Sequence, residues 1–266
     1  MTCVRLGAAA LALAALGASL AAQNATDPAP ATKPDAKAKA PRRARRDPPG
    51  FYQGRRIADV MSFAGADWLI RETREQEEQP EKMLDALNIP AGATVADVGA
   101  GVGYTSLRLA RRVGPKGTVY ATDLQPEMIR MLANNARAAG VKNVKPLLCT
   151  PADTKLPDGK VDLVLMVDVY HECPDPETTL RGVRKALRPG GRLVLVEFRA
   201  EDPDVPIKPE HKMTLKQARR EVEPQGFAFV KSFEFLPWQH VIVFEKPGEA
   251  DAKAKTRASA DDPEGR

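Results

Sequence analysis

The order of apolar and polar positions along the chain switches repeatedly between the period of a strand and the period of a helix. Continuous apolar runs predict buried strands at 93–99, 117–123, 143–149, 161–169 and 192–198. Apolar residues spaced three or four apart predict helices at 104–113, 125–140, 176–187 and 214–226. Strands that alternate with helices favour an α/β fold, with a doubly wound, mostly parallel sheet and helices on both faces.

Two further strands are predicted near the end of the chain, at 227–236 and 238–246. Only Pro237 separates them, and a parallel pair needs a long crossover, so they must run antiparallel. The sheet therefore has seven strands, the last of them antiparallel. Upstream, residues 65–87 predict one or two amphipathic helices that cover one end of the sheet.

Residues 1–22 have the layout of a secretory signal peptide. Arg5 precedes an apolar run of about fifteen residues, and small residues follow, with a candidate cleavage site at Ser19-Leu20-Ala21. This predicts a periplasmic or secreted protein. The alternatives are an uncleaved anchor in the inner membrane and a wrongly assigned start codon.

The segments 23–56 and 248–266 are rich in small, charged and proline residues without an apolar face, so they are expected to be disordered. The folded domain is then expected to span 57–247. The basic residues of the first segment would allow weak contact with anionic lipid headgroups, although a solubilising spacer is the simpler interpretation.

The net charge of +5 does not belong to the predicted domain. Residues 1–56 carry +7, residues 248–266 carry −1, and residues 57–247 also carry −1. A nucleic-acid-binding domain would normally be basic itself, so no nucleic-acid partner is expected.

A glycine-rich segment, "VADVGAGVG" (95–103), follows the first predicted strand. Glycine allows the backbone to approach a ligand closely and to adopt positive φ. The spacing Gly99-x-Gly101-x-Gly103 differs from the G-x-G-x-x-G of dinucleotide-binding folds. Asp97 beside it would repel a pyrophosphate but suits a cationic ligand, so a nicotinamide oxidoreductase is disfavoured.

Four motifs together resemble the class I S-adenosylmethionine-dependent methyltransferases: "VADVGAGVG", "YATDLQPEM", "VDLVLMVDVYHE" and "LRPGGRLVLVE". The resemblance covers roughly residues 80–246. It is strongest to uncharacterised, often exported bacterial methyltransferase-like proteins that share "MSFAGADWLIRETRE" and "IKPEHKMT". It implies the strand order 3-2-1-4-5-7-6 and S-adenosylmethionine as cofactor.

The resemblance also implies which residues bind that cofactor. Asp123 would hold the ribose hydroxyls, Leu124 would lie against the adenine, and Asp153 would meet the adenine amino group. The methionine and ribose end would be lined by Asp97, Gly99, Gly101 and Gly103.

Candidate catalytic residues follow the fourth predicted strand, whose end faces the transferred methyl group in this family: Asp168, Tyr170, His171 and Glu172. His171 could be a general base tuned by Glu172, or both could brace the loop. Tyr170 is expected to form pocket wall. No third ligand has a spacing diagnostic of a metal site with these residues, so no metal is expected.

Other residues bear on the acceptor. Lys208, His211 and Lys212 could bind an anionic substrate, or the segment could be a solvated loop. Trp68 and Arg71 could close a lid, although Trp68 as part of the core is the favoured interpretation. The Asn-Pro-Pro-aromatic and Pro-Cys motifs of nucleobase methylation are absent from the sequence, which favours a small-molecule or lipid-like acceptor.

A second function class competes with a methyltransferase. S-adenosylmethionine is made in the cytoplasm, so an exported chain could be a non-catalytic S-adenosylmethionine-binding protein of the cell envelope.

Export would also raise the question of a disulfide between Cys149 and Cys173. In the implied strand order these residues follow strands three positions apart, about 14 Å at the usual strand spacing. Disulfide Cα atoms lie within about 7 Å of one another, so two free thiols are predicted.

Overall fold

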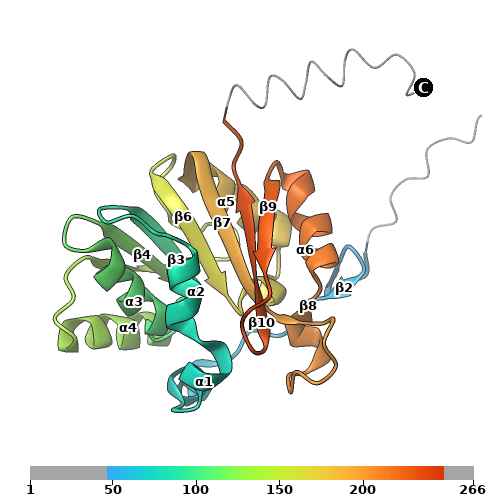
Figure 1. Ribbon diagram of the computed structural model, residues 1–266, viewed down its shortest axis with the longest axis horizontal. Coiled ribbons are helices and arrows are strands. Elements are labelled where there is room, and N and C mark those ends of the chain that lie inside the picture. The colour runs from blue at the N-terminus through green and yellow to red at the C-terminus, as the bar shows by residue number, and fades with distance from the viewer. Residues whose placement is uncertain (1–46, 249–266) are drawn as a thin grey trace, which may run out of the picture. The chain divides into compact units, whose positions relative to one another are not determined.

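The computed structural model describes residues 47–248 (Figure 1). The predicted signal peptide, residues 23–46 of the linker and the tail from 249 lie outside the described residues, so these assignments stay predictions. Within residues 47–248, none of the helices has the length and apolar character needed to cross a membrane.

The central sheet has the predicted strand order. Its strands are β3 (Thr94–Val98), β4 (Thr118–Asp123), β5 (Val144–Leu148), β6 (Val161–Val167), β7 (Leu187–Arg199), β9 (Ala228–Phe233) and β10 (Gln239–Glu245), arranged as β5-β4-β3-β6-β7-β10-β9. β10 is antiparallel to both of its neighbours, whereas β3 to β7 are mutually parallel. The α/β fold class and the strand order are therefore confirmed.

One short strand was not predicted. β8 (Lys212–Met213) pairs in parallel with Phe198 and Arg199 at the end of β7. This pairing fixes the preceding 3-10 helix, Pro209–His211, at the carboxyl edge of the sheet. Figure 1 shows β8 and α1 (Arg74–Glu78) at this same end of the sheet.

Helices cover both faces of the sheet. α2 (Pro80–Ala86), α3 (Tyr104–Val113) and α4 (Pro126–Ala138) pack on one face. α5 (Pro176–Ala186) and α6 (Leu215–Val222) pack on the other face, and their residues Leu180, Val183 and Val222 lie in the hydrophobic core between these helices and the sheet. The near-continuous apolar runs of β3 and β6 follow from this two-sided burial.

The predicted helical lead-in is broken into three short pieces. A 3-10 helix spans Phe63–Ile70, α1 spans Arg74–Glu78 and α2 follows directly. The break between α1 and α2 lies at Gln79, whose φ of 46° is left-handed, and Pro80 then begins α2. A residue before proline is disfavoured in the right-handed helical region, which explains the interruption.

The expectation that residues 23–56 are disordered is wrong for residues 51–56, which are folded. β1 (Phe51–Tyr52) and β2 (Arg55–Arg56) form an antiparallel hairpin. Arg55 donates two hydrogen bonds to the fully buried Glu221 of α6, at 2.8 and 3.0 Å, and a third to the carbonyl of His171 at 2.9 Å. This buried ion pair joins the hairpin to α6, a long-range contact that amino-acid composition cannot reveal.

This ion pair predicts a stability effect. Glu221→Ala should destabilise the protein by about 3–5 kcal/mol, because it leaves the largely buried Arg55 guanidinium without its partner. Arg219→Ala removes the exposed pair of Arg219 with Glu223 and should cost under about 1 kcal/mol. Urea unfolding of the full chain measures both, and equal losses would contradict the anchoring role of Arg55.

Candidate functional site

A cavity of about 450 Å³ lies at the carboxyl edge of the parallel strands. Its walls come from the loops after β3, β4 and β6, from the lead-in and from the segment after β7. Ligands of doubly wound sheets bind at this edge, where neighbouring loops diverge.

The glycine loop forms one wall of the cavity through Gly99 and Gly101. Their φ angles are +74° and +54°, which residues with a side chain rarely adopt. A Cβ on Gly99 would lie 2.4 Å from a methyl of Val169, and one on Gly101 would lie 2.6 Å from Leu69. The loop therefore requires glycine for its own packing as well as for ligand access.

Asp123 and Leu124 line the cavity at the end of β4, as predicted. The two Asp123 oxygens accept hydrogen bonds from the backbone N–H groups of Gly101 and Gln125, each at 2.9 Å. Burial raises the pKa of Asp123, and these hydrogen bonds oppose the shift. The carboxylate keeps lone pairs for a ligand hydroxyl.

Asp97 and Gly103 do not line the cavity, contrary to the prediction, and instead support the loop from beneath. Asp97 is 2% exposed and accepts a 2.6 Å hydrogen bond from the hydroxyl of Ser106. Burial raises its pKa to about 6, which the Ser106 hydrogen bond and the nearby Arg74 oppose. Gly103, with a φ of +89°, is the residue from which α3 begins.

The position of Asp153 does not support the adenine contact predicted for it. Asp153 is exposed, with an oxygen 2.7 Å from the Lys155 ammonium, and it lies outside the cavity wall. Thr150, Pro151 and Thr154 of the same loop line the cavity instead. A tight turn with a Thr150–Asp153 bridge directs the carboxylate to solvent.

Two buried charged residues of the lead-in, Arg74 and Glu78, line the cavity and were missed by sequence reasoning. They form an ion pair at 2.8 Å, and Arg74 also donates to the carbonyl of Leu69 at 2.6 Å. Their i, i+4 spacing is the common pattern of an exposed helix pair, so the sequence carried no signal of their burial.

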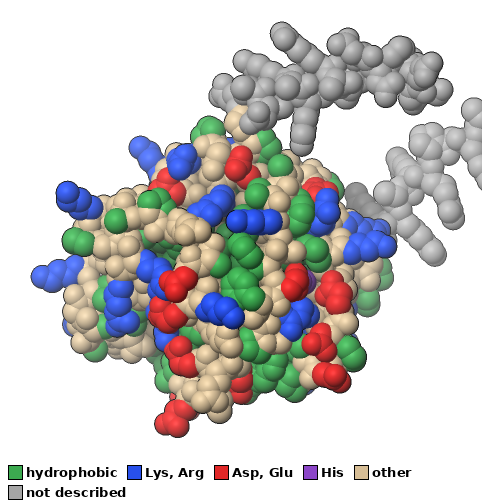
Figure 2. All heavy atoms as spheres, viewed as in Figure 1, with side chains coloured by type: hydrophobic (Ala, Val, Ile, Leu, Met, Phe, Trp, Pro, Cys, Tyr) green, Lys and Arg blue, Asp and Glu red, His purple; other side chains and the backbone are tan. Residues whose placement is uncertain are grey.

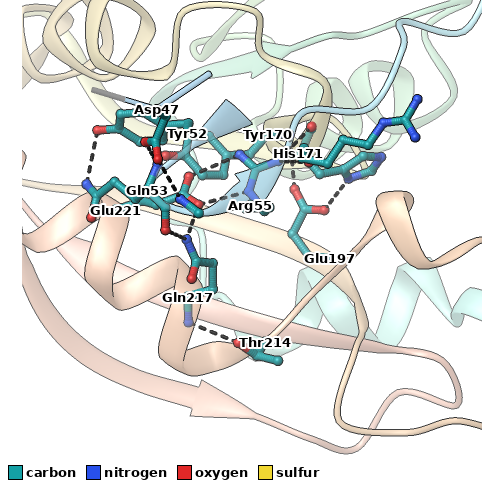
Figure 3. A network of polar contacts seen from close by, with 12 residues as sticks. Asp47, Tyr52, Gln53, Arg55, Tyr170, His171, Glu197, Thr214, Gln217 and Glu221 are labelled. Atoms are coloured by element: carbon teal, nitrogen blue, oxygen red, sulfur yellow. Dashed lines mark hydrogen bonds and ion pairs between the residues drawn. The ribbon is translucent and has the colours of Figure 1, made fainter. Parts of the chain in front are cut away.

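His171 lies on the β6–β7 side of the cavity and is 1% exposed. Its Nδ1 lies 2.5 Å from an oxygen of Glu197, a fully buried residue of β7 (Figure 3). The other Glu197 oxygen accepts from the backbone N–H of Tyr170 at 3.0 Å. The other ring nitrogen of His171, Nε2, lies 3.0 Å from Nδ1 of His211.

Glu172 and His211 complete this polar wall. A Glu172 oxygen lies 3.6 Å from Nδ1 of His211, and the other accepts from the backbone N–H of Met61 at 3.4 Å. Burial raises the pKa of Glu172 to about 7, an effect that His171 opposes. Burial and the neighbouring His171 lower the pKa of His211. We call His171, Glu172 and His211 the HEH cluster.

Asp168 also lines the cavity, at the end of β6. One oxygen accepts from the Gln239 amide at 2.7 Å, and the other is buried with no hydrogen-bond partner among the described residues. Burial raises its pKa well above the usual range, helped by the nearby carboxylates of Glu78 and Glu197. An unpaired polar atom at a cavity wall is suited to a ligand donor.

Tyr170 is not pocket wall, contrary to the prediction. Its side chain is fully buried in the core between the sheet and α5–α6, and the Arg55 guanidinium lies 5.7 Å from its ring centroid. The 3-10 turn at Tyr170–Glu172 sends successive side chains in different directions, so a run of polar residues does not share one cavity.

Both described cysteines, Cys149 and Cys173, are free, as predicted. They line the cavity, but burial raises the pKa of Cys149 to about 11 and that of Cys173 to about 12. Such thiols are poor nucleophiles near neutral pH.

The remaining candidates separate into two groups. Trp68 and Lys208 line the cavity, whereas the Lys212 ammonium donates to the carbonyl of Asp202 away from it. Trp68 is 48% exposed, so its interpretation as core is wrong. The Arg71 guanidinium lies 3.7 Å from the Trp68 ring centroid, but Arg71 itself does not line the cavity.

The outer surface shows no single-sign patch on the face seen in Figure 2, where basic and acidic side chains are interspersed. This distribution agrees with the near-neutral charge of the domain.

Comparison with known proteins places the chain in a family. Residues 89–241, more than half of the chain, match the family model described as "Methyltransferase domain". The chain therefore belongs to this methyltransferase domain family.

Individual relatives are more distant. The chain is 30% identical over 116 residues to the ubiquinone/menaquinone biosynthesis C-methyltransferase UbiE of Hahella chejuensis, a match that covers 43% of this chain and 47% of that protein. It is 26% identical over 171 residues to a demethylmenaquinone methyltransferase of Listeria monocytogenes, which covers 64% and 70% respectively. A solved S-adenosylmethionine-dependent methyltransferase from Aquifex aeolicus superposes with a TM-score of 0.67 at 27% identity, over 70% of this chain and all of that one.

The family and the Aquifex structure imply S-adenosylmethionine as the cofactor, and the residues present fit it. Asp123 offers lone pairs to a ribose diol, and the glycine backbone at 99–101 leaves room beside it. Arg74 is suited to a carboxylate. Asp97 lies outside the cavity wall, two residues before Gly99, so it would favour a cation through its charge and not through contact.

If the cofactor binds at the end of β4, Asp123 should affect its affinity and Asp153, in the adjacent loop, should not. Asp123→Asn should weaken S-adenosylhomocysteine binding about 10- to 100-fold through lost charge-assisted hydrogen bonds. Asp153→Asn, the matched control, should leave the Kd unchanged. Titration calorimetry on the full chain measures both, and an equal loss in the two variants would contradict the placement of Asp153.

Affinity for S-adenosylmethionine should depend on pH through Asp97. With a pKa of about 6 in the free protein, this carboxyl is neutral below that pH and attracts the cationic ligand only above it. If binding requires the charged form, the Kd at pH 5 should be about tenfold weaker than at pH 7.5. Asp97→Asn should flatten the profile between these values, and an unchanged profile in that variant would assign the titration to another group.

Proposed function

We propose that this chain transfers the methyl group of S-adenosylmethionine to a small, largely apolar acceptor that carries an ionisable hydroxyl, such as a phenol or a hydroxyquinone. One observation carries the proposal: a single cavity has the glycine loop and Asp123 on its β3–β4 side and the HEH cluster on its β6–β7 side. Cofactor and acceptor groups can therefore meet within one enclosed space.

The cofactor, when bound, supplies an electrophilic methyl group on a positively charged sulfur. Displacement at this methyl group gains most of its rate from alignment of the nucleophile. The walls that restrict both molecules are then as important as any proton acceptor.

Apolar side chains support the choice of acceptor. Phe198 at the end of β7, with Pro206 and Ile207 after it, lies on the same side of the cavity as the HEH cluster, and Met61 and Leu69 come from the lead-in. An aromatic or quinonoid ring would fill such a wall. The two relatives named for quinone methylation at 26–30% identity support this class of acceptor.

The HEH cluster would receive the acceptor hydroxyl. In the tautomer in which Nδ1 of His171 donates to the Glu197 carboxylate, Nε2 carries no proton and lies toward His211 at the cavity wall. A group of this kind favours the ionised form of the hydroxyl. Ionisation raises the electron density on the oxygen and on the ring carbons ortho and para to it, and any of these atoms can then attack the methyl group.

His171→Gln should lower kcat for methyl transfer by about 100-fold or more, with the Kd for S-adenosylhomocysteine changed less than twofold, since His171 lies away from Asp123. The assay follows the labelled methyl group of S-adenosylmethionine into a panel of phenols and hydroxyquinones, with Asp153→Asn as the control. A wild-type chain that binds the cofactor but methylates only acceptors without a hydroxyl would overturn the proposed acceptor class.

A further inference from the structure

The HEH cluster has the composition and shape of a metal centre. Nε2 of His171 and Nδ1 of His211 are 3.0 Å apart, and a Glu172 oxygen lies 3.9 and 3.6 Å from them. The rings meet edge to face, at an interplanar angle of 81°. Two imidazole nitrogens and one carboxylate oxygen thus converge on one point at the cavity wall.

We propose that His171, Glu172 and His211 bind one divalent transition-metal ion. Metal–nitrogen and metal–oxygen bonds in proteins are about 2.0–2.2 Å. At angles of 90° to 110°, ligand atoms at such distances lie about 2.9–3.5 Å apart. The His–His separation is within this range, and the carboxylate reaches it by a shift of less than about 1 Å.

The surroundings of His171 support a ligand role. Metal-binding histidines nearly always donate their other ring N–H to a carboxylate or a carbonyl, which orients the ring and makes it a stronger donor. Glu197 occupies that position at Nδ1, and it is fully buried. Tyr170 N–H holds the second Glu197 oxygen, so the carboxylate cannot turn away.

The number and type of ligands limit which metal ions suit the site. Three protein ligands leave positions open toward the cavity, as in catalytic rather than structural zinc sites. Two nitrogens and one oxygen suit Zn²⁺, Fe²⁺ or Co²⁺, whereas Mg²⁺ and Ca²⁺ prefer oxygen ligands throughout. The sequence did not reveal the site because His211 lies 40 residues beyond His171. The pairing of β8 with the end of β7 places His211 beside His171 in the fold.

The metal site stands on this geometry alone, and its use in catalysis rests on the proposed function. An open position on the ion would take the acceptor oxygen and stabilise its anion, the hydroxyl proton leaving to solvent. His171 would then favour the anion as a ligand of the metal, and its Nε2 would not itself accept the proton. The anion would then form a bond to the methyl carbon while the bond between that carbon and sulfur breaks. The electron pair of the broken bond would stay on sulfur.

A rival interpretation is a direct hydrogen bond from Nδ1 of His211 to Nε2 of His171, which a 3.0 Å distance also allows. Metal titration separates the two. The full chain, freed of metal with a chelator, is titrated with Co²⁺ and followed by its visible absorption, and Zn²⁺ affinity is measured by calorimetry. The titrations contain neither cofactor nor acceptor, so they test metal binding separately from methyl transfer.

The wild type should bind one ion per chain. His171→Gln, His211→Gln and Glu172→Gln should each weaken binding at least 100-fold, and Glu197→Gln should weaken it about 10- to 100-fold. Glu210→Gln alters the partly exposed acid beside His211, outside the cluster, and should bind as the wild type does. Circular dichroism of each variant confirms its fold.

Absence of Co²⁺ and Zn²⁺ binding at millimolar concentration, or equal binding by the wild type and the three ligand variants, would overturn the metal site. Metal binding without methyl transfer would leave the site standing and count against the proposed function. Full methyl transfer after chelation would support the proposed function and overturn the catalytic use of the metal.

Discussion

The buried carboxylate of Glu197 is the contact on which the acceptor side of the molecule depends. An isolated charge inside a protein is costly unless hydrogen bonds surround it. Glu197 meets this requirement by holding the Tyr170 N–H and His171 Nδ1. The same two bonds fix the turn after β6 and expose Nε2 of His171 to the cavity. Fold stability and chemistry are coupled at one side chain.

Arg55 extends this arrangement from outside the sheet. It joins the β1–β2 hairpin to Glu221 of α6 and to the carbonyl of His171 (Figure 3). The backbone of His171 is thus held from the hairpin while its ring is held from β7. The lead-in that follows the hairpin then passes over the cavity, so the residues before β3 build the site as much as they cover it.

Sequence reasoning was most reliable where local pattern decides structure. The apolar runs of β3 to β7 located the strands, because two-sided burial gives continuous apolar segments, and the short connection before β10 made the last pair antiparallel. The strand order itself came from the resemblance to the class I methyltransferases. Gly99, Gly101 and Asp123 line the cavity because they lie at the ends of predicted strands, and their roles in cofactor binding stay predictions. Free cysteines followed from the topology.

The unsupported predictions for Asp153 and Tyr170 concern the direction of side chains in irregular segments. Asp153 faces solvent and Tyr170 faces the core, although both belong to loops at the cavity edge. Neither strand nor helix periodicity applies to a turn, so alternation cannot tell which side a residue faces. The burial of Arg74 and the approach of His211 depend on long-range packing, which a single sequence does not display.

The central claim is that one cavity holds the cofactor on its β3–β4 side and a metal-bound acceptor oxygen on its β6–β7 side. A crystal structure of the full chain with S-adenosylhomocysteine and Zn²⁺, with anomalous data at the zinc edge, tests it most directly. The account predicts ribose hydroxyls on Asp123, the sulfur directed toward β6, and an anomalous peak between His171, Glu172 and His211. A nucleoside bound over the two histidines, or zinc found only elsewhere on the chain, would contradict it.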